Sequence, residues 1–140
     1  RRKISYIRLR EWVWNFEVWI AKQNSKFRTN LGFIKEKDAH YYLNAADFLF
    51  IPRTSELNSG NITLGFTFGL VVVGADIADI GEILNETGNP TFNVGDDSLY
   101  KATVKAYQLK TQQHGAKNKT LAMNEWSLSK ISYSYIKLMK

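Results

Sequence analysis

The chain has 140 residues, 44% of them hydrophobic and 23% charged, and a net charge of +6, which is typical of one globular domain rather than a disordered segment. It contains no cysteine, so disulfides, thiolate catalysis and cysteine-ligated zinc are excluded. No apolar run approaches the roughly 20 residues that cross a bilayer, and no secretory signal is recognised. The two histidines, His40 and His114, lie in polar helical contexts that favour surface positions over a metal site.

The positive charge is concentrated at the two ends of the chain. Arginines and lysines crowd the first ten residues, and lysines recur from Lys101 to Lys140. Such charge attracts nucleic acid, anionic lipid or a phosphorylated small molecule. No recognisable nucleic-acid module accompanies it, so nucleic acid is not expected as a partner. A basic, solvated surface explains the same residues equally well.

The N-terminal segment predicts an amphipathic helix over residues 4–22. Its hydrophobic residues recur at three- and four-residue steps, as one helical face requires. Trp12 and Trp19 widen this face, which therefore needs a cover, either a packing partner or a membrane interface. On this basis we divide the chain into an N-terminal helix, residues 1–24, and a folded domain, residues 25–140. The residues of the face are Leu9, Val13, Phe16 and Ile20.

Strand-like and helix-like segments alternate in the rest of the chain. Residues 48–51 form a continuous apolar run, typical of a parallel strand buried on both faces, and residues 71–73 form a second. A helix expected at 80–86 would be capped by Asp79 and stopped by Gly88. The other expected elements are strands at 30–34 and 91–93 and helices at 35–46, 96–113 and 120–139, the last two separated by a polar break at 114–118. This alternation predicts an α/β fold, a Rossmann-like three-layer α/β/α domain with a mainly parallel sheet.

One segment resists a purely local interpretation. Hydrophobic residues alternate with small or polar ones from Ile62 to Phe68, which is the period of a strand, and Gly65 is unfavourable in a helix. Two parallel strands, however, need a crossover of a dozen or so residues, usually helical. The stretch 52–70 has that length. We therefore expect a helix that begins near Asn61.

The polar stretch from Glu56 to Asn61 follows the first apolar strand and carries the functional signal. In a parallel sheet such a loop lies at the carboxyl ends of the strands, where backbone N–H groups can bind phosphate. Gly60 lets the backbone approach closely, and the Ser59 hydroxyl adds a donor. Ser59 and Asn61 are alternatively helix caps in an ordinary turn. A nucleotide or nucleotide-sugar site is the hypothesis that the loop favours.

An ordered series of short motifs spans residues 31–138. Each motif alone is weak, but their order and spacing resemble the C-terminal, donor-binding domain of GT-B-fold glycosyltransferases of the retaining, group 1 type. The resemblance implies that the chain is half of an enzyme that moves a sugar from a UDP- or GDP-sugar to a glycan or lipid-linked acceptor. The N-terminal acceptor domain would lie outside the chain. The motifs are Gly32-Phe33-Ile34, Ala46-Asp47 with Pro52, Glu56, Gly69 to Val73, Glu82, Gly88, Gly95-Asp96 and Glu125-Trp126-Ser127-Leu128.

The resemblance also implies roles for individual residues. Glu56 would be the catalytic acidic residue and would accept hydrogen bonds from the donor sugar, with Asn58 beside it. No metal ion and no cofactor is implied apart from the nucleotide-sugar substrate. The diphosphate would be held by Ser59, Gly60, Asn61 and Arg53, and the nucleobase by Phe33 and Ile34.

Departures from the family pattern keep alternatives open. Arg53 is equally explained as a solvated loop charge, and Phe33 and Ile34 as core residues. The family's second acidic residue, eight positions after Glu56, is Leu64 here, which cannot bind the donor ribose. A non-catalytic GT-B-like domain for interaction or membrane docking is therefore the alternative. A flavodoxin-like regulatory domain would need an acidic cluster that is not found. The expected location is the cytoplasm, alone or peripheral to the inner membrane.

Overall fold

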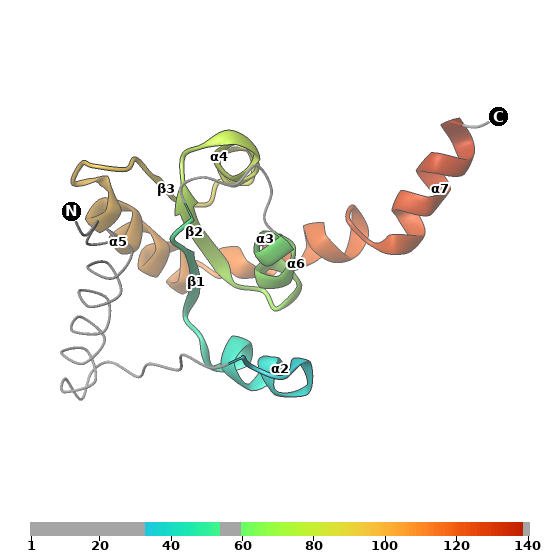
Figure 1. Cartoon of the computed structure of the whole chain (residues 1–140), viewed down its shortest axis with the longest axis horizontal. Helices are drawn as coiled ribbons and strands as arrows, with labels where there is room; N and C mark the ends of the chain where they lie inside the picture. Colours follow the sequence, from blue (N-terminus) through green and yellow to red (C-terminus); the bar gives the residue numbers. More distant parts are fainter. Residues whose placement is uncertain (1–32, 54–59, 139–140) are drawn as a thin grey trace, which may run out of the picture. The chain divides into compact units, whose positions relative to one another are not determined.

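The structure of the chain is a computed structural model that describes residues 33–53 and 60–138. From Glu36 onward the chain forms one compact unit, an α/β domain in which a three-stranded parallel sheet is flanked by helices in a Rossmann-like arrangement (Figure 1). The predicted fold class is confirmed. The elements are α2 (Glu36–Ala45), β1 (Phe48–Ile51), α3 (Gly60–Thr67), β2 (Val71–Ala75), α4 (Ala78–Glu86), β3 (Thr91–Phe92), α5 (Ser98–Thr111), α6 (His114–Asn124) and α7 (Leu128–Leu138).

Strand β2 is the centre of the sheet and lies between β1 and β3. All five of its residues are buried, as expected of a branched apolar strand whose two faces are both covered. Strand β1 was predicted to be buried on both faces as well, and this prediction is wrong. Ile51 is buried, but Phe50 is 40% exposed, because β1 pairs only with β2 in the described part of the sheet.

Helices cover the two faces of the sheet (Figure 1). Successive side chains of β2 point to opposite faces, so Val72 packs in one hydrophobic cluster while Val71 and Val73 pack in another. Trp126 closes the first cluster by stacking on Phe66, with ring centroids 5.3 Å apart and planes inclined by 8°. The first cluster contains Ile51, Ile62, Phe66, Val72, Ile80, Leu84 and Ala122 from β1, α3, β2, α4 and α6. The second contains Val71, Val73, Ala75, Phe92, Ala102 and Ala106 from β2, β3 and α5.

The segment that alternates like a strand is the helix α3, as predicted from the crossover requirement. Ile62 and Phe66, four residues apart, are buried, whereas Leu64 is 41% exposed, so burial follows the helical and not the strand period. Gly65 is required by packing, because a Cβ there would lie 2.8 Å from Cγ2 of Val72. The helix thus contacts the sheet closely through a residue that disfavours helices locally.

Two buried asparagines complete the sheet where β3 is too short to do so. Strand β3 pairs only with Gly74 and Ala75 of β2. At the other end of β2, the backbone N–H of Val72 donates to Oδ1 of Asn89 (3.0 Å). Nδ2 of Asn118 donates to the carbonyl of Leu70 (2.8 Å). The two amide groups also bond each other, at 3.0 Å in each direction. These amides satisfy backbone groups that a longer β3 would otherwise pair with.

Helix α6 begins at His114, and the predicted break at 114–118 is wrong. Two polar residues of this stretch face inward: Asn118 is buried, and Nε2 of His114 lies 3.0 Å from the carbonyl oxygen of Thr87. Gly115 lies against the turn after α3, where a Cβ would be 1.8 Å from the Gly69 oxygen. The break between α5 and α6 lies instead at Gln112 and Gln113, and a second break follows Asn124, inside the segment for which one continuous helix was predicted.

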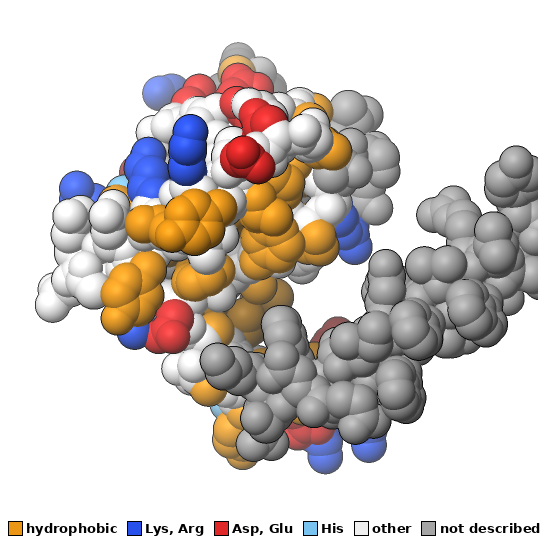
Figure 2. All heavy atoms as spheres, turned by 90° about the vertical axis from the view of Figure 1, so that its left-hand side faces the viewer, with side chains coloured by type: hydrophobic (Ala, Val, Ile, Leu, Met, Phe, Trp, Pro, Cys, Tyr) orange, Lys and Arg blue, Asp and Glu red, His pale blue; other side chains and the backbone are white. Residues whose placement is uncertain are grey.

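Helices α2 and α7 expose most of their side chains. Helix α2 has no buried residue, and Tyr41, Tyr135 and Leu138 are among the large exposed hydrophobic residues. Hydrophobic side chains also gather at the surface of the described part in Figure 2. Among the helices formed by residues 33–53 and 60–138, none has the length and hydropathy needed to span a membrane.

Candidate functional site

The loops that follow the three strands meet at one edge of the sheet. All strands run parallel, so their carboxyl ends lie at the same edge, where α/β proteins of this architecture bind ligands. At this edge lie Pro52 and Arg53 after β1, the turn between β2 and α4, and the loop between β3 and α5. We take this edge as the candidate site.

The N-terminus of α3 is the part of the edge that suits an anion best. Gly60 and Asn61 are its first two residues, and both are exposed. Among the described residues, no heavy atom lies within 4 Å of a Cβ built on Gly60. The first backbone N–H groups of a helix have no partner within the helix, and the helix dipole places partial positive charge there. The structure therefore leaves open space next to donors that a phosphate group could use.

The structure brings together only some of the residues predicted for the site. Arg53 is exposed and follows β1 at the same edge as Gly60 and Asn61. Phe33 and Ile34 precede α2, and neither lies in a strand, so the predicted strand at 30–34 is wrong for these two residues. They are 89% and 37% exposed, which also contradicts the alternative that they are core residues. The rest of that expected strand lies outside the described residues, as do Glu56, Asn58 and Ser59.

The turn between β2 and α4 is held by side chains. Nδ2 of Asn85 donates to Oδ1 of Asp76 (2.9 Å), and Oγ1 of Thr91 donates to Oδ1 of Asn85 (3.2 Å). Ala78 has a φ of +41°, a strained value for a residue other than glycine and one that is frequent at functional sites. Asp79 was predicted to cap α4, and this prediction is wrong, because the cap position is Ile77 and Asp79 lies in the first turn. There the negative charge of Asp79 interacts favourably with the partial positive charge at the N-terminus of the helix. Alanine carries no signal for positive φ, so sequence reasoning missed this strain.

The loop between β3 and α5 is closed by its own hydrogen bonds. The backbone N–H of Asn93 donates to Oγ of Ser98 (2.7 Å), and the N–H of Ser98 donates to Oδ1 of Asp96 (2.8 Å). Hydrogen bonds from Ser98 hold the pKa of the Asp96 carboxyl below its ordinary value, with smaller contributions from Asn93 and the charge of Lys101. Asp96 is therefore an ionised acceptor occupied within its own loop and not a proton donor.

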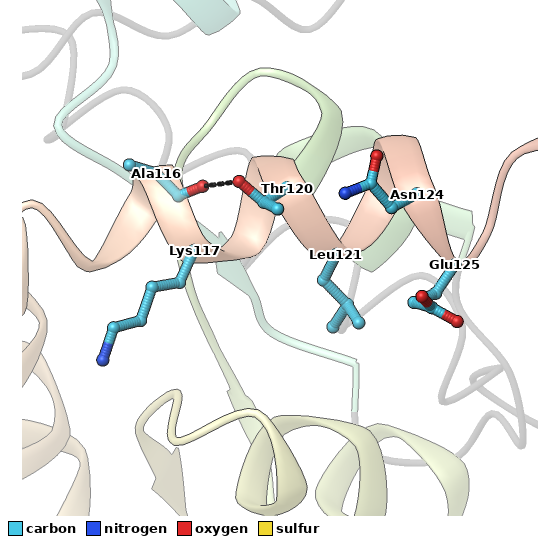
Figure 3. Close-up of a pocket in the computed structure, with 6 residues that line it drawn as sticks. All are labelled: Ala116, Lys117, Thr120, Leu121, Asn124 and Glu125. Atoms are coloured by element: carbon cyan, nitrogen blue, oxygen red, sulfur yellow. Dashed lines mark hydrogen bonds between the residues drawn. The ribbon is translucent and has the colours of Figure 1, made fainter.

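One hollow formed by described residues includes none of the residues of this edge. It is an open groove of about 470 Å³ along α6, lined by Lys117, Leu121 and Glu125 among others (Figure 3). Helix α6 begins beside the N-terminal end of β2, where Asn118 reaches the Leu70 carbonyl. No group of three or more possible metal ligands occurs among the residues that the structure describes. The groove brings no reactive pair of side chains together, so the site is assigned to the loops of the opposite edge.

The fold defines an α/β protein with a parallel sheet flanked by helices. Searches against models of protein families, curated proteins and solved structures gave no match to the chain.

Proposed function

We propose that the chain is the nucleotide-sugar-binding domain of a retaining GT-B-fold glycosyltransferase, which moves a sugar from an NDP-sugar to a glycan or lipid-linked acceptor. The observation that carries the proposal is the start of α3 at Gly60, at the carboxyl edge of a parallel sheet. The loop that precedes this helix contains Glu56 and Asn58. The ordered series of family-like motifs in the sequence supports the same function.

In this reaction negative charge develops on the departing diphosphate while the sugar becomes cation-like. Positioning and stabilisation of that charge are the main contributions a protein can make. The backbone N–H groups of Ser59, Gly60 and Asn61 would bind the diphosphate, and Arg53 would add positive charge. Glu56 would accept hydrogen bonds from the sugar hydroxyls and so select the sugar. The acceptor would be bound by a partner domain.

One observation favours a second candidate, a GT-B-like domain that binds without catalysing transfer. Leu64 occupies the position of the second acidic residue of the family pattern, and it is 41% exposed on α3. An apolar residue there cannot bond a ribose hydroxyl. In this candidate the exposed hydrophobic residues, such as Phe50, would serve an interaction with another protein or a membrane.

Titration of the chain with UDP, GDP and ADP, followed by calorimetry, tests the proposal with Gly60→Val as the informative variant. A Cβ built on Gly60 meets no described atom within 4 Å, so we expect a valine there to leave the fold intact. Its methyl groups would fill the position of the phosphate. Loss of two charge-assisted hydrogen bonds costs about 3 kcal/mol, which is about a hundredfold in Kd. Thr67→Val, at the exposed far end of α3, is the control and leaves Kd unchanged.

Two results distinguish the candidates. Binding of UDP or GDP that Gly60→Val abolishes and Thr67→Val preserves supports the donor-binding function. If none of the three nucleotides binds at millimolar concentration while both variants have the parent's melting temperature, the proposed nucleotide-sugar site is refuted. In that case binding of the chain to anionic vesicles in flotation experiments would favour the second candidate.

A further inference from the structure

A small crevice lies along the open edge of β3, between α4 and α5. Its volume is about 190 Å³. Strand β3 pairs with β2 on one side only in the described sheet, so the crevice occupies its other side. It is separate from the N-terminus of α3, because α3 follows β1, and β2 lies between β1 and β3 in the described sheet. The lining residues are Asn85, Asn89, Pro90, Thr91, Ser98, Lys101, Ala102 and Lys105.

The charge of the lining is positive. Lys101 and Lys105 are one helical turn apart on α5, and no acidic side chain lines the crevice. Two like charges at this spacing repel each other. An anion bound between the two ammonium groups would reduce this electrostatic repulsion. Asp96 is an opposing charge close to Lys101: besides the hydrogen bonds from Ser98, the charge of Lys101 helps to lower the pKa of that carboxyl. The Asp96 carboxylate already accepts the backbone N–H of Ser98, so it neutralises the two lysines only in part.

Neutral donors are available beside the lysines. The backbone N–H of Gly74 bonds the Pro90 carbonyl, and that of Asp76 bonds the Phe92 carbonyl. In a parallel ladder the intervening residue then directs its own N–H and C=O away from the partner strand. The N–H of Thr91 therefore faces the open edge, where the crevice lies.

The bottom of the crevice is preorganised. Asn89 is 2% exposed, and its amide is fixed by hydrogen bonds to Val72, Thr87 and Asn118. A site whose lining cannot rearrange loses little entropy when it binds a ligand. The small volume suits one compact group with few additional atoms.

We propose that this crevice binds a small dianion, namely inorganic phosphate or the phosphate group of a small metabolite. Lys101 and Lys105 supply the charge, and the N–H of Thr91 supplies a directed donor. Ionised oxyanions form the strongest hydrogen bonds with such groups.

The experiment is a titration of the ¹⁵N-labelled full chain, with amide chemical shifts as the readout. The probes are inorganic phosphate and glycerol 3-phosphate, with glycerol and sodium chloride at equal ionic strength as controls. We expect saturable shifts of the Thr91 and Ser98 amides with both phosphates and with neither control. The double variant Lys101→Ala, Lys105→Ala should weaken binding about tenfold, the sum of two partly exposed charge contacts.

The matched control is Lys117→Ala, Lys119→Ala, which removes two lysines of α6 and the same net charge. This variant should bind phosphate like the parent, and all variants should keep the parent's melting temperature because the four lysines are exposed. Saturation with inorganic phosphate but not with glycerol 3-phosphate would identify the free ion as the ligand. Chemical-shift changes that do not saturate, or an equal loss of phosphate affinity in both double variants, would overturn the proposal. Such results would indicate non-specific electrostatic attraction of the anion to a basic surface.

Discussion

Replacement of Asn118 by leucine isolates the contribution of the buried amide pair to stability. The side chain is 1% exposed, and leucine has a similar size, so the change removes hydrogen bonds without opening a large cavity. Nδ2 of Asn118 donates to the Leu70 carbonyl at 2.8 Å and to Oδ1 of Asn89 at 3.0 Å. In the variant the Leu70 carbonyl and the Asn89 amide, at both its Oδ1 and its Nδ2, lose a hydrogen-bond partner while they stay buried.

The magnitude follows from these two groups. A buried polar group that loses its partner costs about 1–3 kcal/mol, so the variant should be less stable by about 3 kcal/mol. For a domain of this size that is a fall in Tm of about 10 °C. Asn89 retains its bonds to Val72 and Thr87, which keeps the loss below that of a complete disruption.

Thermal and urea unfolding followed by circular dichroism measure the loss. Asn124→Leu is the control, because Asn124 lies on the same helix and is exposed; it should change stability by less than about 0.5 kcal/mol. The double variant with Asn89→Leu should cost less than the sum of the two single variants, since the two amides bond each other. A parent-like Tm for Asn118→Leu would refute the reasoning that these amides replace missing strand pairing.

Two further predictions concern the packing of α6 and the loop before α5. Gly115→Ala places a Cβ 1.8 Å from the Gly69 oxygen and should cost at least about 3 kcal/mol, whereas Gly60→Ala, where the space is open, should be nearly neutral in urea unfolding. Ser98→Ala should raise the pKa of Asp96 toward the ordinary value in a ¹³C carboxyl titration, because Ser98 supplies the main hydrogen bonds that lower it. Since this pKa is depressed, the stabilisation is present above the unfolded pKa of the carboxyl and is lost as pH falls through the folded value. An unchanged midpoint would contradict the assigned cause.

Sequence patterns predicted the elements that are specified by residues close together in the sequence. The continuous apolar run at residues 71–73 predicted a buried strand, which in the structure extends to Ala75, and Gly88, with a φ of +71°, marked the end of α4. The helix α3 was predicted against its local alternation, because two parallel strands need a crossover. The expected position of Gly60 at the start of that helix followed from the same argument.

The candidate site could be predicted only in outline. Gly60, Asn61 and Arg53 reach the carboxyl edge as expected, since the order of strand and loop fixes that edge in any parallel sheet. The strained φ of Ala78 and the hydrogen bonds between Asp76, Asn85 and Thr91 depend on elements that approach one another across the fold. No local pattern encodes such contacts.

The sequence by itself determined the α/β class, the parallel sheet and the end of the sheet from which the strand-to-helix loops leave, because apolar periodicity and the need for a crossover between parallel strands can both be recognised along the chain. Only the tertiary structure decided that the polar stretch 114–118 is the start of α6 and not a break. Asn118 looks like a solvated residue in sequence, yet it is buried because β3 begins only at Thr91, too late to pair with the first residues of β2. A polar residue is placed inside when a distant backbone group needs its hydrogen bond, and that need exists only after the chain has folded.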